Sequence, residues 1–479
     1  MYSILLSIMT TKGWMIDNEP TWRLLTWIAP FCYFVIFNKR RRCPCGGKQL
    51  NTEFRGQAGG QWIRKYYETM AQDITSNILK LYIIKISKWF MLTMPVIFLF
   101  YKENGLGTRE LFVLKAVYSV SIVVLEVPSG YFGDAWGRKS SLVVGSVLGF
   151  VGFGLYCFSS DFWGFMACEM ILGIGQSFIS GSDSAMLYDT LLAAGNERAY
   201  LKTEGKMISF GNFAEALAAP LGVFLAASSL RTPFYFQAVV AFSAVPAALL
   251  LIEPERTEMP EKTTCKNILS IIGYALVLNR PLRWKIIYSS IIGTATLTMA
   301  WFVQPYFVFM EIPLGLYGIL IPLLNLTAGM TSMAAYRIES GIGRTNTLFF
   351  IAIAIPSGYF CLGLCATAYG VIFLFMFYFF RGVATPILRN YINENTPSSI
   401  RATVMSIRNL LIRLSFVILG PFLGWHADRA GLPTTLIGGG ALFLVPGIVF
   451  AYFSSRQTGA MEKELEFKPE SLRKERYPA

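Results

Sequence analysis

From residue 77 onward this chain is divided into apolar runs of about 20 residues or more, separated by shorter polar connections. A helical run of that length matches the ~30 Å hydrocarbon core of a bilayer. Backbone exposed to lipid must satisfy its own hydrogen bonds, which favours helices. The pattern predicts an all-α membrane protein with twelve transmembrane helices. The expected spans are 79–101, 109–133, 140–159, 162–190, 205–227, 233–252, 284–306, 314–336, 346–366, 368–392, 400–424 and 434–453.

The composition agrees with this class of protein and excludes others. The 479 residues are 54% hydrophobic and only 15% charged, whereas soluble proteins carry about 25% charged residues. A net charge of +13 needs no nucleic acid to explain it, because membrane proteins collect Lys and Arg in cytoplasmic loops. One histidine, His426, and eight scattered cysteines argue against a metal site. Without a Gly-x-x-x-x-Gly-Lys-Ser/Thr loop an ATP-driven pump is disfavoured, and we expect no cofactor.

The spans divide into two groups of six. The longest polar connection, 253–283, separates a first lobe at 77–252 from a second lobe at 284–455, and a tail follows at 456–479. Lys and Arg concentrate in the connections that lie on the same side as the start of the first span. The positive-inside rule therefore predicts that both termini are cytoplasmic.

The first 76 residues differ from the rest of the chain. Their apolar run at 22–37 has 16 residues, contains Pro30 and precedes four basic residues, so it is marginal as a span and unlike a signal peptide. We expect an upstream start codon, with the working protein beginning near Met70. An additional membrane anchor is the alternative.

The connection after the second span carries a dense motif. It reads Gly130-x-x-x-Asp134-x-x-Gly137-Arg138-Lys139, with two glycines near a tight turn and charges at the membrane surface. A related Gly-Arg-x-x-x-Leu sequence begins at Gly343, 206 residues after Gly137, between the second and third spans of the second lobe.

This motif resembles the signature that follows the second helix in the major facilitator superfamily. The resemblance covers residues 77 to about 455 and implies two pseudo-symmetric six-helix lobes. It also implies a cytoplasmic latch, in which Asp134 meets Arg138 and the start of helix 11. The residues assigned to this latch are Gly130, Asp134, Gly137, Arg138, Lys139, Asp189 and Arg401. For Asp189 a salt bridge at a gate is expected, and Arg401 also marks a helix start.

Charged residues inside spans are costly, so they face protein or water and mark function. Helices 3, 6, 7, 8, 9 and 12 have none in their interiors. Acids dominate the core of the first lobe and arginines that of the second, which predicts an attraction between the lobes. The candidates for a substrate or proton pathway are Glu169, Arg381, Glu215, Glu126 and Arg413. Glu126 is equally compatible with a structural pair to an arginine of helix 11.

Glu169 is the leading candidate because it lies near mid-membrane, roughly 11 Å from the outer end of its helix at 1.5 Å per residue. A carboxylate held between desolvation and a nearby Arg381 can change its protonation state as the lobes move. The alternative is a permanent ion pair with Arg381 or Arg413. Drug:proton antiporters of the superfamily carry arginine where this chain has Glu169 before Gly173 and Gly175, and this departure weakens the case for antiport.

These observations predict a monomeric, multi-pass transporter of the bacterial inner membrane. It would move a small solute across the lipid bilayer by alternating access, and efflux coupled to protons is the preferred interpretation. Proton-coupled uptake of a metabolite is the alternative. A polytopic membrane enzyme or sensor is less compatible, because no catalytic constellation is evident.

Overall fold

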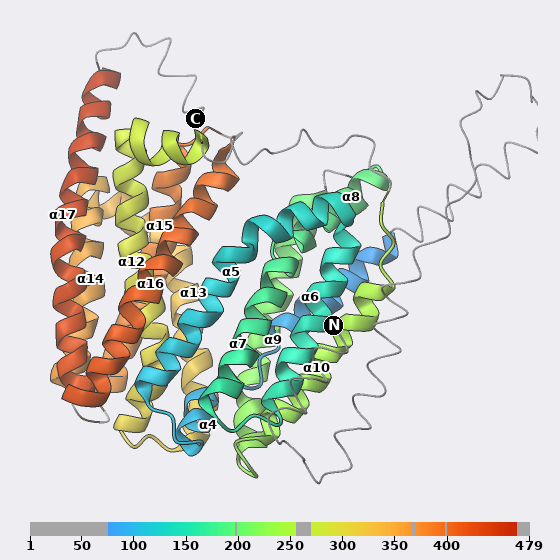
Figure 1. The fold of residues 1–479 in the computed structure, drawn as a ribbon. Coiled ribbons are helices and arrows are strands. Elements are labelled where there is room, and N and C mark those ends of the chain that lie inside the picture. The colour runs from blue at the N-terminus through green and yellow to red at the C-terminus, as the bar shows by residue number, and fades with distance from the viewer. Residues whose placement is uncertain are drawn as a thin grey trace, which may run out of the picture. The chain divides into compact units, whose positions relative to one another are not determined.

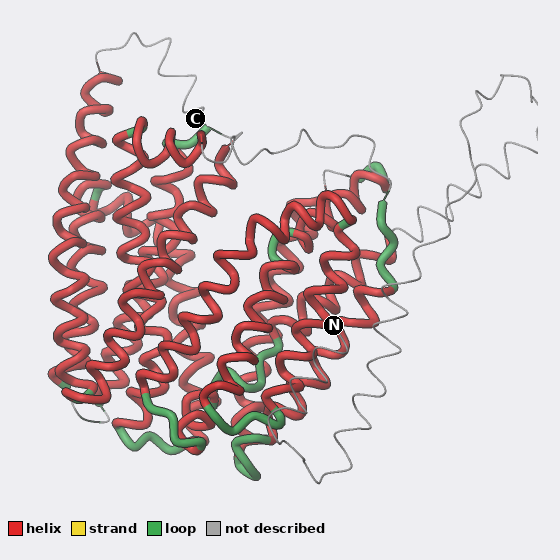
Figure 2. The backbone as a smooth tube through the Cα atoms, in the orientation of Figure 1, coloured by secondary structure: helices red, strands yellow, loops and turns green. Residues whose placement is uncertain are grey.

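A computed structural model describes residues 75–196, 199–254, 270–365, 367, 369–397 and 400–466. The proposed extension with Met70, the middle of the connection between the lobes and the end of the tail lie outside these residues. The described part of the chain is built of helices, with no strand (Figures 1 and 2). Eleven of its helices are long and apolar enough to cross a membrane.

The helices follow the predicted spans closely. After a helix at 75–89, the first lobe contains α4 (Ile97–Glu103), α5 (Thr108–Trp136), α6 (Arg138–Tyr156), α7 (Phe162–Ile179), α8 (Ser182–Ala193), α9 (Tyr200–Ala226) and α10 (Thr232–Leu249). The short π-helix η2 (Tyr274–Leu278) precedes the second lobe. That lobe contains α12 (Arg280–Phe309), α13 (Leu314–Ile342), α14 (Arg344–Leu364), α15 (Gly370–Glu394), α16 (Arg401–Ala430) and α17 (Leu432–Glu466).

The first span is not the continuous helix predicted for 79–101. Its helix ends at residue 89, turns occupy 92–96, and α4 begins at Ile97. Pro95 lies in this interruption; it has no backbone N–H and disfavours helical geometry at the residue before it. Buried backbone groups freed by a break need new partners. The Leu92 N–H donates to Oε1 of Gln237 on α10 at 2.7 Å.

The fourth span, predicted as one helix over 162–190, is also interrupted. α7 ends at Ile179 and α8 begins at Ser182, with Gly181 between them at φ +81°. A glycine adopts this left-handed conformation without the steric cost that a side chain would carry. The first lobe thus contains two discontinuous helices, a feature that transporters use to build binding sites near the bilayer midplane.

The two lobes meet through α5 with α16 and through α9 with α13. At the start of α5, Asp428 of α16 accepts hydrogen bonds from the N–H groups of Thr108 at 3.0 Å and Arg109 at 2.7 Å. The first N–H groups of a helix lack intrahelical partners, so the second lobe supplies the cap for α5. Nearby, the Phe112 ring packs against Phe302 with centroids 4.6 Å apart. These contacts join the lobes at the Thr108 end of α5.

The internal repeat seen in the sequence is also a repeat of conformation. Gly137 separates α5 from α6 with φ 100° and ψ 144°, and Gly343 separates α13 from α14 with φ 84° and ψ 153°. In each lobe the arginine that follows pairs with an acid near the end of the fourth span. Arg138 Nε lies 3.2 Å from Asp189 Oδ2, and Arg344 forms an ion pair with Glu394.

Candidate functional site

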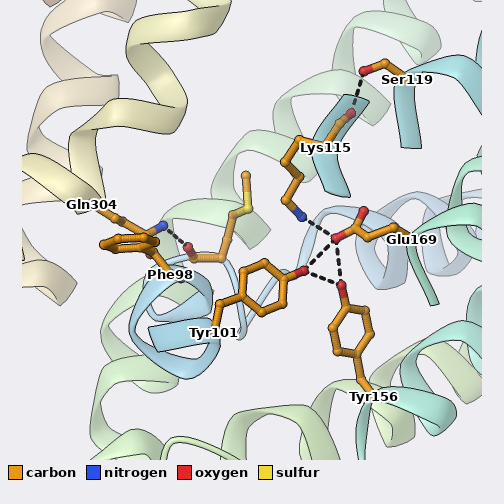
Figure 3. Close-up of polar contacts among 8 residues, drawn as sticks. Phe98, Tyr101, Lys115, Ser119, Tyr156, Glu169 and Gln304 are labelled. Atoms are coloured by element: carbon orange, nitrogen blue, oxygen red, sulfur yellow. Dashed lines mark hydrogen bonds and ion pairs between the residues drawn. The ribbon is translucent and has the colours of Figure 1, made fainter. Parts of the chain in front are cut away.

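A buried ionic cluster centred on Glu169 lies in the first lobe (Figure 3). Glu169 on α7 is only 2% exposed and forms an ion pair with Lys115 of α5. The same carboxylate oxygen, Oε1, accepts hydrogen bonds from the hydroxyls of Tyr156 at 2.7 Å and Tyr101 at 3.0 Å. The two tyrosine hydroxyls lie 2.5 Å apart, and because each has one proton, a hydroxyl that donates to its neighbour does not donate to the carboxylate at the same time. Lys115 and the tyrosine hydroxyls thus stabilise the carboxylate.

Glycines on α7 allow the close helix packing that assembles this cluster. A Cβ on Gly173 would lie 2.7 Å from the Tyr118 carbonyl oxygen of α5, and a Cβ on Gly175 would lie 3.0 Å from the Gly145 carbonyl oxygen of α6. Only glycine permits these backbone approaches. They draw α5 and α6 against α7, which carries Glu169 one turn before Gly173.

The second lobe contacts this cluster through α12. The Trp301 ring lies with its centroid 4.7 Å from Lys115 Nζ, a cation–π geometry. One turn later, Gln304 Oε1 accepts from the Phe98 N–H at 3.0 Å and Gln304 Nε2 donates to the Met94 carbonyl at 2.6 Å (Figure 3). Gln304 therefore satisfies backbone groups freed by the interruption before α4, and α4 carries Tyr101 to Glu169.

A cavity of about 220 Å³ adjoins the cluster and is called here the first-lobe cavity. The interrupted first span, α5, α6, α7 and α10 surround it, and Trp301 closes it from the second lobe. Most of its lining is apolar or aromatic. Its charged lining residues are Lys88, Lys115 and Glu169. Such a cavity suits a small amphipathic solute.

The prediction of an arginine partner for Glu169 was wrong. The sequence suggested Arg381 or Arg413, but the ion pair is with Lys115. Lys115 was identifiable as a charge inside the second span, yet the rotation of α5 relative to α7 decides which charges meet. Tyr101 and Tyr156, which complete the cluster, were missed because tyrosines are common in membrane spans and nothing in the pattern singles them out.

The other pathway candidates lie apart from this cluster. Glu215 on α9 is half-buried and is attracted electrostatically by Arg381 on α15. That interaction agrees with the expected attraction between the lobes. The Arg381 guanidinium lies 5.1 Å from the Tyr378 ring centroid. Arg413 on α16 interacts electrostatically with Tyr118, which lines the first-lobe cavity.

Glu126 has no described partner of the kind expected. It is half-buried, and it forms no ion pair with any residue that the structure describes. The structural pairing with an arginine of helix 11, one of the two alternatives, is therefore not found there.

Most of the predicted latch residues lie around the turn between α5 and α6, whereas Arg401 begins α16 in the second lobe. Arg138 forms the salt bridge to Asp189 described above, while the exposed Asp134 lies at the end of α5. The N–H groups of Arg138 and Lys139 donate to the two carboxylate oxygens of Glu253 at 2.8 and 2.7 Å. Glu253 thus caps α6. The sequence could not reveal this role, because Glu253 lies more than 100 positions after the start of α6. Arg401, the first residue of α16, is exposed and donates weakly to the Thr396 carbonyl at 3.5 Å.

Comparison with known proteins assigns the family. The family model of the Major Facilitator Superfamily matches residues 86–419. The chain belongs to this superfamily. Members of this superfamily are transporters, and the two groups of membrane-length apolar helices agree with a multi-pass membrane protein of this family.

Individual superfamily relatives are more distant. The Quinolone resistance protein NorA of Staphylococcus aureus strain MSSA476 is 24% identical over 208 residues, which are 43% of this chain and 50% of that protein. The chain therefore spans about half the length of the curated relatives it matches. Among solved structures, the nucleoside transporter NupG has a TM-score of 0.66 at 12% identity, covering 80% of this chain and 98% of that one. A D-xylose-proton symporter has a TM-score of 0.58 at 17% identity, covering 80% and 97%.

Proposed function

We propose that this protein is a secondary active transporter that exports a small solute in exchange for protons by alternating access. The observation that carries the proposal is that Glu169 and Lys115 form a buried ion pair whose surroundings are supplied by both lobes. Trp301 covers Lys115, and Gln304 holds the segment that leads to Tyr101. Movement of one lobe against the other therefore changes the environment of Glu169.

Coupling requires two states with different affinities for the proton. When the lobes separate at the Thr108 end of α5, α12 withdraws from α4 and from Lys115. The segment before α4 then loses Gln304, and the Tyr101 hydroxyl is no longer held against Glu169. Because hydrogen bonds and nearby charges set the protonation of a buried carboxylate, this movement alters the balance between the charged and the neutral form of Glu169.

The direction of export is favoured by the similarity to a quinolone resistance protein. Uptake of a metabolite with protons is the second candidate, and the likeness to a D-xylose-proton symporter is compatible with it. We further propose that the protein works as a monomer in the inner membrane, with both termini in the cytoplasm. The domain boundaries given above, with lobes at 77–252 and 284–455, belong to the same proposal.

Reconstitution into liposomes tests the function. Flux of a quinolone, a nucleoside, D-xylose and a small organic anion, benzoate, would be measured with and without an imposed proton gradient, from both sides of the membrane. We expect gradient-driven flux of at least one solute, and loss of that driven flux in Glu169→Gln with exchange of solute retained. Unchanged driven flux in the variant would remove Glu169 from coupling and make Glu215 the next carboxylate to test. If the native protein transports solute at the same rate with and without the proton gradient, proton coupling is contradicted.

A further inference from the structure

The first-lobe cavity is surrounded by more positive than negative side chains. Lys88 of the first span and Lys115 of α5 line it, against Glu169 of α7, and Lys85 and Asp183 of α8 are electrostatic neighbours of Lys88. Lys85 Nζ lies 2.9 Å from Asp183 Oδ2, and Lys115 is paired with Glu169. These two ion pairs use both acids and leave one cation over.

That remaining cation is Lys88. It lines the cavity and makes no hydrogen bond or ion pair with any residue in the described part of the chain. Its electrostatic neighbours are Asp183, which attracts it but is hydrogen-bonded to Lys85, and Lys85 itself, which repels it. Lys88 is half-buried, and an ammonium partly removed from water without a hydrogen-bonded partner is unfavourable, so a bound counter-charge would be attracted to this position.

The other residues that line the cavity indicate what kind of molecule would carry this counter-charge. Phe153, Phe234 and Trp301 supply aromatic surface, and Ile97 and Leu172 supply aliphatic surface. A volume of about 220 Å³ is small compared with the roughly 300–1,000 Å³ of sites for drug-sized ligands. The cavity therefore combines an unpaired cation with an apolar enclosure of small size.

We infer that the solute is a small organic anion, with a carboxylate-like group bound at Lys88 and an apolar body enclosed beside Trp301. This inference rests on the proposed transport function and names the class of its substrate.

A cationic solute fits less well. Glu169 is the acid that lines the cavity, and its charge is already matched by Lys115 and two tyrosine hydroxyls. Arg413 of the second lobe adds a further positive charge in electrostatic range of Tyr118 on the cavity wall. A cation would therefore meet net repulsion.

The negative charge of the solute also affects the direction of transport. The membrane potential does work on any charge that crosses the membrane. In a cell with a negative interior, that potential drives an anion outward, and exchange for an entering proton adds to the same driving force. Export of an organic anion is thus favoured by both components of the proton gradient.

Binding of three isosteric probes to the purified full-length protein tests the inference. Benzoate, benzyl alcohol and benzylammonium share one aromatic body and differ in charge. We expect benzoate to bind at least about 10-fold more tightly than the other two, which corresponds to about 1.4 kcal/mol. Lys88→Gln should lower benzoate affinity about 10-fold and leave benzyl alcohol unchanged, while Lys88→Arg should retain most of the benzoate affinity. Lys80→Gln is the matched control, because Lys80 lies on the same helix, does not line the cavity and donates to Ser76 within the described part of the chain.

The outcomes separate this inference from the proposed function. Tighter binding of benzylammonium, or equal binding of all three probes, overturns the anionic class even if proteoliposomes transport another solute. Unchanged benzoate affinity in Lys88→Gln overturns the assigned position. Because Lys88 is a half-buried cation without a hydrogen bond in the described part of the chain, its replacement relieves a desolvation cost, and Lys88→Gln should fold and melt at the native temperature or above. Specific benzoate binding without gradient-driven flux of any solute would instead contradict the transporter and leave the binding site standing.

Discussion

Gln304 of the second lobe accepts a hydrogen bond from the Phe98 N–H of the first lobe at 3.0 Å and returns one to the Met94 carbonyl at 2.6 Å. A backbone interrupted at membrane depth must find partners for its polar groups. Here the other lobe provides them, so separation of the lobes at this end leaves a donor and an acceptor without partners. The interruption before α4 therefore depends on the conformation of the whole transporter.

Gln304→Leu should shift the protein toward the state in which the lobes are apart at the Thr108 end of α5. The variant removes two hydrogen bonds that the native protein makes only in the closed state and leaves the buried backbone groups without partners there, at a cost of about 1–3 kcal/mol. Spin labels at Ser228 and Thr434, which are exposed on opposite lobes, would report a larger fraction of long distances. Gln237→Leu is the control, because Gln237 serves the same interruption from within the first lobe. A distance distribution identical to that of the native protein would exclude Gln304 as a conformational contact.

Glu169→Gln should lower thermal stability, and Lys115→Met added to it should restore most of the loss. Lys115 is 5% exposed, and leaving one partner of a buried ion pair alone costs about 3–5 kcal/mol. The double variant removes both charges, so its melting temperature in detergent should exceed that of the single variant. Proton-driven flux should stay absent in both. If the double variant melts no higher than the single one, the ion pair is not what Glu169→Gln disrupts.

Gly137→Ala should destabilise the protein by about 1–3 kcal/mol, the usual cost of a strained backbone conformation. Gly137 adopts φ 100°, and a Cβ there would lie 3.2 Å from the Glu253 carboxylate that caps α6. Gly130→Ala is the control, since Gly130 lies within α5 and its Cβ would meet open space; its melting temperature should be unchanged or slightly higher. Equal melting temperatures for the two variants would show that the turn tolerates a side chain.

Asp134→Asn should slow transport without unfolding the protein. The amide keeps the shape of the side chain but loses its charge and with it the strong, charge-assisted hydrogen bonds. Labelling of a cysteine introduced at the cytoplasmic end of α16 would report the conformational balance. Normal flux together with unchanged labelling would refute a latch at Asp134. Asp189→Asn offers a comparison, because Asp189 holds Arg138 within the first lobe.

The sequence alone determined the class of the fold. Each apolar run of about 20 residues specifies a membrane helix, because burial of backbone in lipid leaves few alternatives. It also located Glu169 at a depth where charge is costly, and it identified the repeated turns at Gly137 and Gly343. These are properties of position along one helix, which residue spacing encodes directly.

Only the tertiary structure decided which of these residues meet. The rotation of α5 against α7, set by close packing at Gly173, brings Lys115 to Glu169 in place of Arg381. The tertiary structure also decided that the helices are interrupted at Pro95 and at Gly181. At the first interruption, Gln237 and Gln304 satisfy the freed backbone groups. Contacts between residues separated by more than 100 positions depend on helix rotation and on the approach of the lobes, and the pattern of a single chain carries neither quantity.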